Sequence, residues 1–220
     1  MSAWLERAFA DAPINHVPSL DRPTDPPRLF IGVDLAQVSD YTAVAIVEQH
    51  GRAGEAVYHV RHLERIERGT SYPLIVQHIA TLARQPSIAE RSALVVDQTG
   101  VGRAVVDLIR AEQLRAQLVP VTITGGDSAH RGDTGWLTPK RDLVASVQVL
   151  LQTQRLKVAP ALASAALLTE ELEAFQVKLS PSGMDSYGAW REGTHDDLVL
   201  SVALAVWAGE RGIGAPLRAY

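Results

Sequence analysis

The stretch Leu29-Phe30-Ile31-Gly32-Val33-Asp34 decides the fold, because it is a short apolar run that ends in an acid. It is too short for a helix, rich in β-branched residues and set between prolines and a polar turn, so it predicts a buried strand. The next apolar run, Tyr41 to Val47, has the same character, and the two runs together predict a hairpin. A buried strand ending in a carboxylate is a rigid support for a metal ligand, although Asp34 alone could equally cap the turn.

The rest of the chain alternates between strand and helix patterns. Further strands are predicted at 58–66, 93–97, 118–124 and 156–159, and a last hairpin at 176–190. Helices are predicted after Pro73, over 101–109, from Thr138 at the cap, over 160–175, and from Thr194 to Trp207, the last almost wholly apolar. Three antiparallel strands followed by βα units predict an α/β fold with a mixed sheet flanked by helices.

The length of 220 residues fits one sizeable core. Residues 1–28 contain five prolines after a short segment of helical pattern, and we expect an N-terminal arm or linker there, or a leader without a role. The domain is then expected over 29–212, with a C-terminal tail at 213–220. The loop 125–135 is rich in Gly, Asp and Ser and is expected to be mobile.

Charge and composition limit the class of protein. The net charge of −4 excludes a uniformly cationic nucleic-acid binder, so any such surface must be local or assisted by bound cations. The absence of cysteine excludes disulfides and thiolate metal sites. No apolar stretch reaches membrane-spanning length and the first residues do not resemble a signal peptide, so we expect no membrane partner and a cytoplasmic protein.

Two further acidic points occupy positions like that of Asp34. Asp97 ends the apolar run from Ala93, at the C-terminal end of a central strand, where open α/β sheets place catalytic groups. Asp196 and Asp197 precede the apolar C-terminal helix, where carboxylates gain from the helix dipole. Thr194 and Asp197 also fit a capping box, a purely structural alternative. Asp196 lacks that explanation, because charge at a buried helix end is costly without a compensating cation.

Carboxylates from three distant segments, each at an element end, suit a hard divalent cation with oxygen ligands. Two such ions, roughly 3.5–4 Å apart, can activate a water and stabilise the leaving oxygen in phosphodiester hydrolysis. We therefore expect a site for two Mg²⁺ or Mn²⁺ ions. Asp34 would bridge them, Asp97 would hold one, and Asp196 with Asp197 would supply the other side; the division within that pair stays open.

Five segments of the chain also resemble, in order, the motifs of a known family. They are Ile31-Gly32-Val33-Asp34-Leu35 through Asp40-Tyr41-Thr42-Ala43, Val96-Asp97-Gln98-Thr99-Gly100-Val101-Gly102, Pro139-Lys140-Arg141-Asp142-Leu143-Val144, Leu156-Lys157-Val158-Ala159 and Gly193-Thr194-His195-Asp196-Asp197-Leu198-Val199. These segments resemble the nuclease domain of phage terminase large subunits. That domain has a ribonuclease H-like fold related to the Holliday-junction resolvases.

The resemblance implies a metal-dependent endonuclease that cuts double-stranded DNA during phage genome packaging, with Asp34, Asp97, Asp196 and Asp197 as catalytic metal ligands. It also implies a terminase ATPase, a small terminase subunit or a portal as partners, in the host cytoplasm if a phage encodes the chain. The chain lacks the phosphate-binding motif G-x-x-x-x-G-K-[ST] of the motor that precedes such nucleases. We therefore expect an excised domain or a stand-alone gene product that cannot translocate DNA itself.

Four cations are candidates for DNA contacts. Lys140 and Arg141 begin a helix, where the dipole disfavours cations, so phosphate binding is one reason for their presence and solvated side chains the other. Arg131 lies in the loop 125–135, which could reach over DNA, and Lys178 lies beside the last hairpin. His195 could assist proton transfer or simply belong to the helix cap.

Three other functions stay open at this point. One is a structure-selective resolvase or ribonuclease on the same fold. A second is a non-catalytic DNA-docking module of the packaging machinery. A third is a sugar-kinase-like ATPase, which shares the opening hairpin but would need a longer chain for two lobes.

Overall fold

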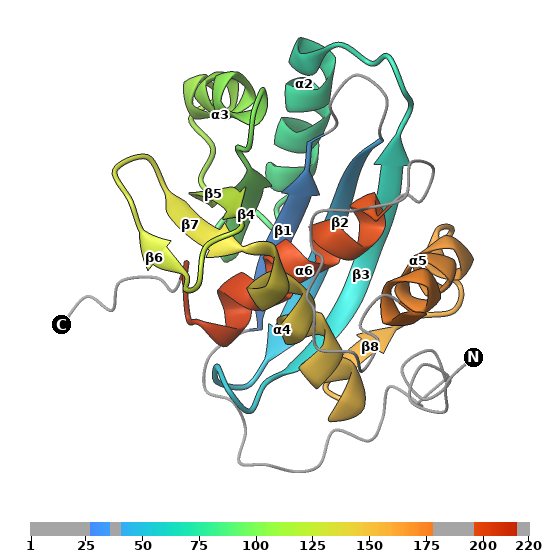
Figure 1. The fold of residues 1–220 in the computed structure, drawn as a ribbon. Helices are drawn as coiled ribbons and strands as arrows, with labels where there is room; N and C mark the ends of the chain where they lie inside the picture. The colour runs from blue at the N-terminus through green and yellow to red at the C-terminus, as the bar shows by residue number, and fades with distance from the viewer. Residues whose placement is uncertain (1–26, 36–40, 178–195, 215–220) are drawn as a thin grey trace, which may run out of the picture.

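The computed structural model describes residues 27–35, 41–177 and 196–214. Its described strands form one mixed sheet of eight, in the order β6-β7-β5-β4-β1-β2-β3-β8 (Figure 1). The strands are β1 Arg28–Asp34, β2 Thr42–His50, β3 Val57–Ile66, β4 Ser92–Asp97, β5 Gln117–Thr124, β6 His130–Arg131, β7 Trp136–Pro139 and β8 Leu156–Val158.

Strands β1, β2 and β3 pair antiparallel, as the sequence predicts. Strand β4 adds to β1 in parallel, β5 to β4, and β7 to β5, while β8 adds in parallel to β3 at the other edge. The predicted fold class, a mixed sheet of three antiparallel strands extended by βα units, is therefore confirmed. Because β1, β4, β5 and β7 run in the same direction, the carboxyl ends of these four strands lie at the same end of the sheet.

Helices cover both faces of this sheet (Figure 1). One face carries α4, α5 and α6, whose apolar residues share a core cluster with Phe30, Val47 and Val95. The other face carries α2 and α3, packed on Ile31, Val33 and other residues of the central strands. The helices are α2 Tyr72–Ala83, α3 Gly102–Ala111, α4 Lys140–Gln152, α5 Ala165–Val177 and α6 Asp197–Glu210.

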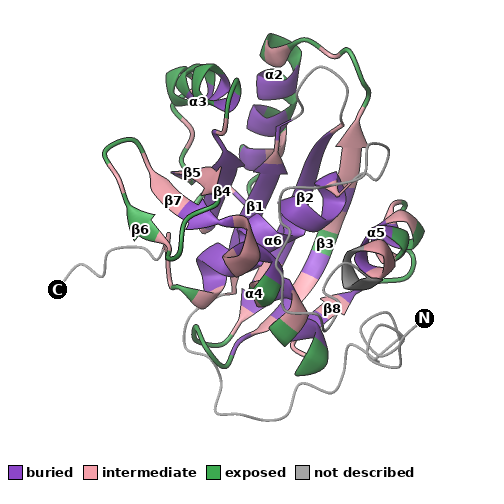
Figure 2. Ribbon diagram, in the orientation of Figure 1, coloured by how far each residue is buried: buried purple, intermediate pink, exposed green. Residues whose placement is uncertain are grey.

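Helix α6 is the most deeply buried helix described, because every residue from Asp197 to Gly209 is buried (Figure 2). It packs directly on β1 at Gly32, where a Cβ would lie 1.9 Å from the backbone oxygen of Ser201. Only glycine permits that approach, since no other residue leaves this space empty. The contact brings the first turn of α6 to the strand end that carries Asp34. None of the helices in the described ranges combines the length and apolar character of a membrane span.

Two details of the sequence interpretation need correction. Residues 136–139 form strand β7, and β6 lies within the predicted loop 125–135. Helix α4 consequently begins at Lys140 after Pro139, with no side-chain cap, instead of at a Thr138 cap. Thr138 pairs with Ile123 in the sheet, because sheet pairing outweighs a local capping preference. The N-terminal arm, the hairpin at 176–190, Thr194, Lys178 and His195 lie wholly or largely outside the described residues.

Candidate metal centre

The sheet register places two of the predicted acids side by side. Val33 of β1 pairs with Val96 of β4 in a parallel ladder, so the next residues, Asp34 and Asp97, end neighbouring strands at the same level. Neighbouring strands lie about 4.8 Å apart, and alternation directs both side chains to the face that carries α6, because Val33 and Val96 face the other core. The two carboxylates therefore belong to one row at the carboxyl edge of the sheet.

The same row continues to β3. Asp34 pairs with Ala43 of β2, and Ala43 pairs with Arg65 of β3. The row across four strands is thus Asp97, Asp34, Ala43 and Arg65, with a buried small residue in its middle. An arginine at the end of a row of acids supplies a fixed positive charge to the site.

Helix α6 brings the second pair of acids to this row. Its first residue is Asp197, which is 3% exposed, and Asp196 precedes it. The Gly32–Ser201 contact sets the height of the helix over β1, one turn after Asp197. The charges of Asp97, Asp196 and Asp197 all act on the carboxyl of Asp34, so the four aspartates lie within electrostatic reach of one another.

The neighbouring carboxylates affect the pKa of Asp34. Burial raises the pKa of Asp34 well above its usual range, and the negative charges of Asp97, Asp196 and Asp197 raise that pKa further. The positive charge of Lys140 acts in the opposite direction on the pKa of Asp34. The charged form of Asp34 is therefore unfavourable in the protein alone, and a bound cation would relieve this cost.

Asp97 is held by its own turn. Its Oδ1 accepts hydrogen bonds from the backbone N–H of Thr99 at 2.8 Å and from the Thr99 hydroxyl at 2.5 Å. Burial raises the pKa of Asp97, while these hydrogen bonds and the charge of Lys140 oppose the rise. Gly102 lets α3 start close to the strand end, because a Cβ there would lie 2.4 Å from the Asp97 backbone oxygen.

Lys140 enters the site from the start of α4. Its Nζ lies 2.8 Å from Oδ2 of Asp196, and both side chains are about four-fifths buried, at 22% and 20% exposure. The sequence points to Lys140 as a phosphate-binding cation; the structure brings this side chain into the acidic cluster itself. Its ammonium is a monovalent charge placed among carboxylates that are candidates for divalent ions.

Two site residues were missed by sequence reasoning. Arg65 donates from Nε to Oδ1 of Asp197 at 2.7 Å and from a terminal nitrogen to Oε1 of Glu171 at 2.5 Å. Oε2 of Glu171 accepts the backbone N–H of Val199, in the first turn of α6, at 3.0 Å. Burial raises the pKa of Glu171 to about 8, and the nearby charge of Asp197 contributes to that rise. Neither residue has a sequence signal beyond a charge inside an otherwise amphipathic segment.

The donor set fits a hard divalent cation. All four candidate ligands are carboxylates, the ligand type that Mg²⁺ and Mn²⁺ prefer. Oδ2 of Asp197 is buried and accepts no hydrogen bond from an N–H group of the described residues. Within those residues no three acidic or histidine side chains already have the close spacing of a metal site. Mutual repulsion, together with the pairing of Asp196 to Lys140 and of Asp197 to Arg65, accounts for this spread.

The remaining predicted DNA contacts are less central. Arg141 is 39% exposed and pairs with Asp127 in the loop before β6, and Arg131 is exposed on β6 itself. Arg141 follows Lys140 in the first turn of α4, whereas Arg131 pairs with Trp136, at the end of β7 away from the start of α4. Lys178 and His195 lie outside the described residues.

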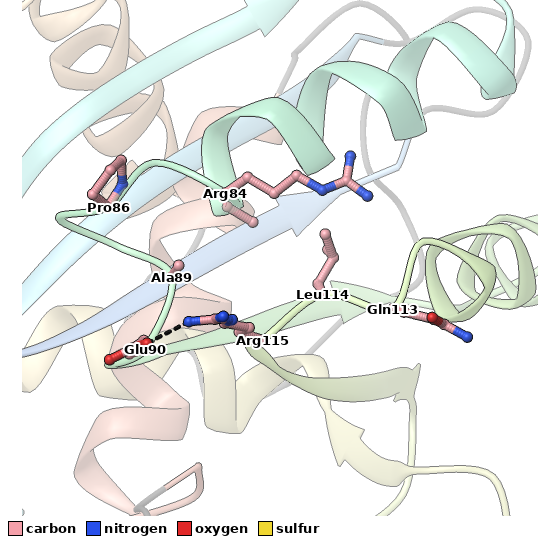
Figure 3. Close-up of a pocket in the computed structure, with 8 residues that line it drawn as sticks. Arg84, Pro86, Ala89, Glu90, Gln113, Leu114 and Arg115 are labelled. Carbon is pink, nitrogen blue, oxygen red and sulfur yellow. Dashed lines mark hydrogen bonds and ion pairs between the residues drawn. The ribbon is translucent and has the colours of Figure 1, made fainter.

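A surface pocket of about 530 Å³ lies beside the segments that lead into β4 and β5, at the amino-terminal ends of these strands (Figure 3). It is lined by Arg84, Glu90, Leu114 and Arg115, among others, and Figure 3 shows Glu90 paired with Arg115. Glu90 precedes the start of β4, whereas Asp97 ends it, so the strand separates this pocket from the acids. The pocket therefore is not part of the candidate centre.

Comparison with known proteins identifies the family of the chain. The family model described as the terminase RNaseH-like domain matches residues 31–208, from β1 to the end of α6. Among curated proteins, none is significantly similar in sequence to the chain.

Solved structures share the fold at low sequence identity. The large terminase nuclease from thermophilic phage G20c with bound magnesium has a TM-score of 0.55 and 22% identity, covering 84% of this chain and 82% of that one. A second structure of that nuclease gives the same TM-score at 21% identity, with 81% of each chain covered. The Mn-soaked human cytomegalovirus terminase nuclease domain has a TM-score of 0.57 and 14% identity, with 94% of each chain covered.

Proposed function

Because the chain belongs to the terminase RNaseH-like domain family, we propose that it is a metal-dependent endonuclease that cleaves double-stranded DNA during genome packaging. The observation that carries this proposal is the convergence of four aspartates. The charges of Asp97, Asp196 and Asp197 all act on the half-buried carboxyl of Asp34, from the end of β4 and the start of α6. The solved terminase nucleases with similar folds include magnesium-bound and manganese-soaked forms, which supports divalent-ion use.

Each aspartate would have a distinct role as a ligand. Asp34 lies between the other acids and is the candidate to bridge two ions. Asp97 would hold one ion, with its free oxygen set by the two hydrogen bonds from Thr99. Asp196 and Asp197 would complete the other side. When bound, two divalent ions would activate water and stabilise the leaving 3′ oxygen of the scissile phosphodiester.

The chain's own cations would bind and orient the DNA. Lys140 and Arg141 begin α4 next to the acids, and Arg131 lies on the neighbouring hairpin. Lysine and arginine there would contact backbone phosphates, which fix register without reading bases, so we expect low sequence specificity. When a divalent ion pairs with Asp196, the ammonium of Lys140 would be released to a phosphate of the substrate. Lys178 is a further candidate for the same role.

Within a packaging machine this domain would supply the cutting step. Translocation would require an ATPase motor, and a small terminase subunit and a portal are the other expected partners. These partners follow from the family alone.

Nicking of supercoiled plasmid in Mn²⁺ tests the proposal. Wild type should convert plasmid to open-circular and linear forms, and Asp34→Ala and Asp197→Ala should reduce that rate at least a hundredfold. Asp107→Ala is the matched control, because Asp107 lies exposed on α3 and pairs with Arg110. That control should cleave at the wild-type rate.

Parallel substrates separate the alternatives on the same fold. Linear duplex, a four-way junction and an RNA–DNA hybrid are assayed at equal concentration. Preference for the junction or the hybrid would indicate a resolvase or a ribonuclease. DNA binding without Mn²⁺-dependent nicking of any substrate would indicate a non-catalytic docking module and refute the proposal.

A further inference from the structure

We propose that Arg65 is a positioning residue for Asp197, holding Oδ1 of that carboxylate so that Oδ2 is the oxygen that binds a divalent cation. The inference rests on the proposed nuclease function, because it concerns a ligand of the same centre. Arg65 acts through Asp197 and does not contact the reacting atoms in this assignment. The assignment also distinguishes Asp197 from Asp196, because Asp197 would bind the ion through one defined oxygen, Oδ2.

The guanidinium of Arg65 joins carboxylates from two helices. It contacts Asp197 of α6 over 2.7 Å and Glu171 of α5 over 2.5 Å. The Arg65 side chain is 15% exposed and each acid side chain 4% exposed, so water competes little for these contacts. Charge-assisted hydrogen bonds from a planar, rigid donor fix the orientation of the acceptor. The Asp197 carboxylate therefore has one well-defined rotamer.

The backbone reinforces the same orientation. Oδ1 of Asp197, already bonded to Arg65, also accepts the N–H of Leu198 at 2.9 Å. Glu171, the second partner of Arg65, accepts the N–H of Val199. Arg65 is thus anchored to the very helix end that it orients, and Glu171 caps α6 from a different helix. The Asp196 side chain forms no cap, so this cap in trans satisfies an otherwise orphan donor.

Arg65 is itself fixed from two sides. Its Cα is set by the sheet, where it pairs with Ala43, the residue that pairs with Asp34. Its guanidinium carbon lies 4.8 Å from the ring centroid of Tyr41, a cation–π contact that restricts the plane of the group. The position of Asp197 relative to Asp34 therefore depends on the pairing of β1, β2 and β3 as well as on the packing of α6.

The two oxygens of Asp197 consequently differ. Oδ1 has two N–H donors, whereas Oδ2 is buried without an N–H donor among the described residues; a protonated Glu171 carboxyl also hydrogen-bonds the Asp197 side chain. A buried carboxylate oxygen without a donor is unfavourable, and a metal ion would satisfy it. Groups that hydrogen-bond to a metal ligand commonly alter metal affinity by about 10–100-fold.

Positioning and simple electrostatics predict opposite effects of removing Arg65. By Coulomb's law, loss of a positive charge beside the acids should strengthen binding of a divalent cation. If Arg65 instead holds Asp197 in place, its loss should weaken binding although the site becomes more negative. The sign of the change therefore separates the two descriptions.

Titration calorimetry with Mn²⁺ on the full chain provides the test. We expect Arg65→Met to weaken Mn²⁺ binding about tenfold, with duplex affinity in Ca²⁺ unchanged within twofold. Arg65→Lys, which keeps the charge but cannot span both carboxylates, should show an intermediate loss. Arg61→Met is the matched control on β3, since Arg61 is exposed and pairs with Glu48 away from the site. It should bind Mn²⁺ like wild type.

Circular dichroism, and a melting temperature well above the assay temperature, establish that each variant is folded. If Arg65→Met does not fold, the Mn²⁺ affinity of Arg65→Lys decides the test. Affinity equal to or tighter than wild type in the deciding variant overturns the inference, even if its melting temperature falls. The outcome is separable from the proposed function. A wild-type protein that neither binds Mn²⁺ nor nicks plasmid refutes the function, whereas an active wild type with an unaffected variant refutes only the role of Arg65.

Discussion

The ammonium nitrogen of Lys140 lies 2.8 Å from Oδ2 of Asp196, so a lysine from α4 neutralises an acid at the start of α6. Its charge also opposes the raised pKa values of Asp34 and Asp97, which places it within the field of the whole cluster. In the protein without divalent ions, Lys140 is therefore a built-in counter-cation. A divalent ion at Asp196 must compete with it.

Lys140→Met should consequently destabilise the protein in EDTA and strengthen its binding of Mn²⁺. The first effect follows because four aspartates lose a compensating charge, and the second because Asp196 loses a competing partner. Melting curves in EDTA and titration calorimetry with Mn²⁺ measure the two changes. Lys157→Met, on β8, serves as the control, and equal behaviour of the two lysine variants contradicts this account. Lys140 and Arg65 variants should thus shift Mn²⁺ affinity in opposite directions.

Asp34→Asn should raise the melting temperature in EDTA and abolish any stabilisation by millimolar Mg²⁺. Burial and three neighbouring carboxylates make the charged form of Asp34 unfavourable, so a neutral isostere removes that cost. The same change removes the proposed central metal ligand, and with it the mass-action stabilisation that a bound ion would give. Differential scanning fluorimetry with and without Mg²⁺ measures both effects. Asp107→Asn should keep the wild-type response, and a Mg²⁺-dependent rise retained in Asp34→Asn speaks against Asp34 as a ligand.

Gly32→Ala should be strongly destabilising, by about 3 kcal/mol or more, or roughly 6–12 °C in melting temperature for a domain of this size. The added Cβ would lie 1.9 Å from the Ser201 backbone oxygen, so α6 would have to move away from β1. Gly125→Ala is the control, because nothing lies within 4 Å of a Cβ there and its backbone is unstrained. Melting temperatures that fall equally in both variants are incompatible with close packing of α6 on β1.

His59→Asn should reduce the loss of stability on acidification. Burial lowers the pKa of His59 to about 4, and the positive charges of His50, Arg61 and Lys157 add to this while Glu48 opposes it. The unfolded chain, with a histidine pKa of about 6.5, then binds more protons than the folded one between about pH 6.5 and 4. Stability is therefore present above that window and is lost as the pH falls through it.

Melting temperatures recorded from pH 7.5 to 4.5 measure the contribution of His59 to stability. The melting temperature should fall by a few degrees less in His59→Asn than in wild type over this range. His130→Asn, on the exposed strand β6, is the control and should retain the wild-type slope. Identical slopes in wild type and His59→Asn would show that His59 does not contribute.

Much of the site follows from local sequence alone. Asp34 and Asp97 end short, β-branched apolar runs, and a run of that kind predicts a buried strand whatever the rest of the chain does. Asp196 and Asp197 precede a helix that is apolar on all sides, which indicates burial at that end. Because the carboxyl ends of parallel strands lie at the same end of a sheet, acids at those ends are predicted to lie near one another even when the register is unknown.

Arg65, Glu171 and the true position of Lys140 depend on tertiary structure. A charge within β3 or α5 looks like any solvated charge of an amphipathic element, because periodicity reports which face is polar but not what covers it. Arg65 faces Asp197 only because β3 lies two strands from β1, and Glu171 caps α6 only because α5 packs beside it. Arg65 lies more than 100 positions from both Glu171 and Asp197, so the energies of these two contacts depend on the packed fold. The sequence predicts the candidate ligands of the centre, and the fold decides which charged side chains contact them.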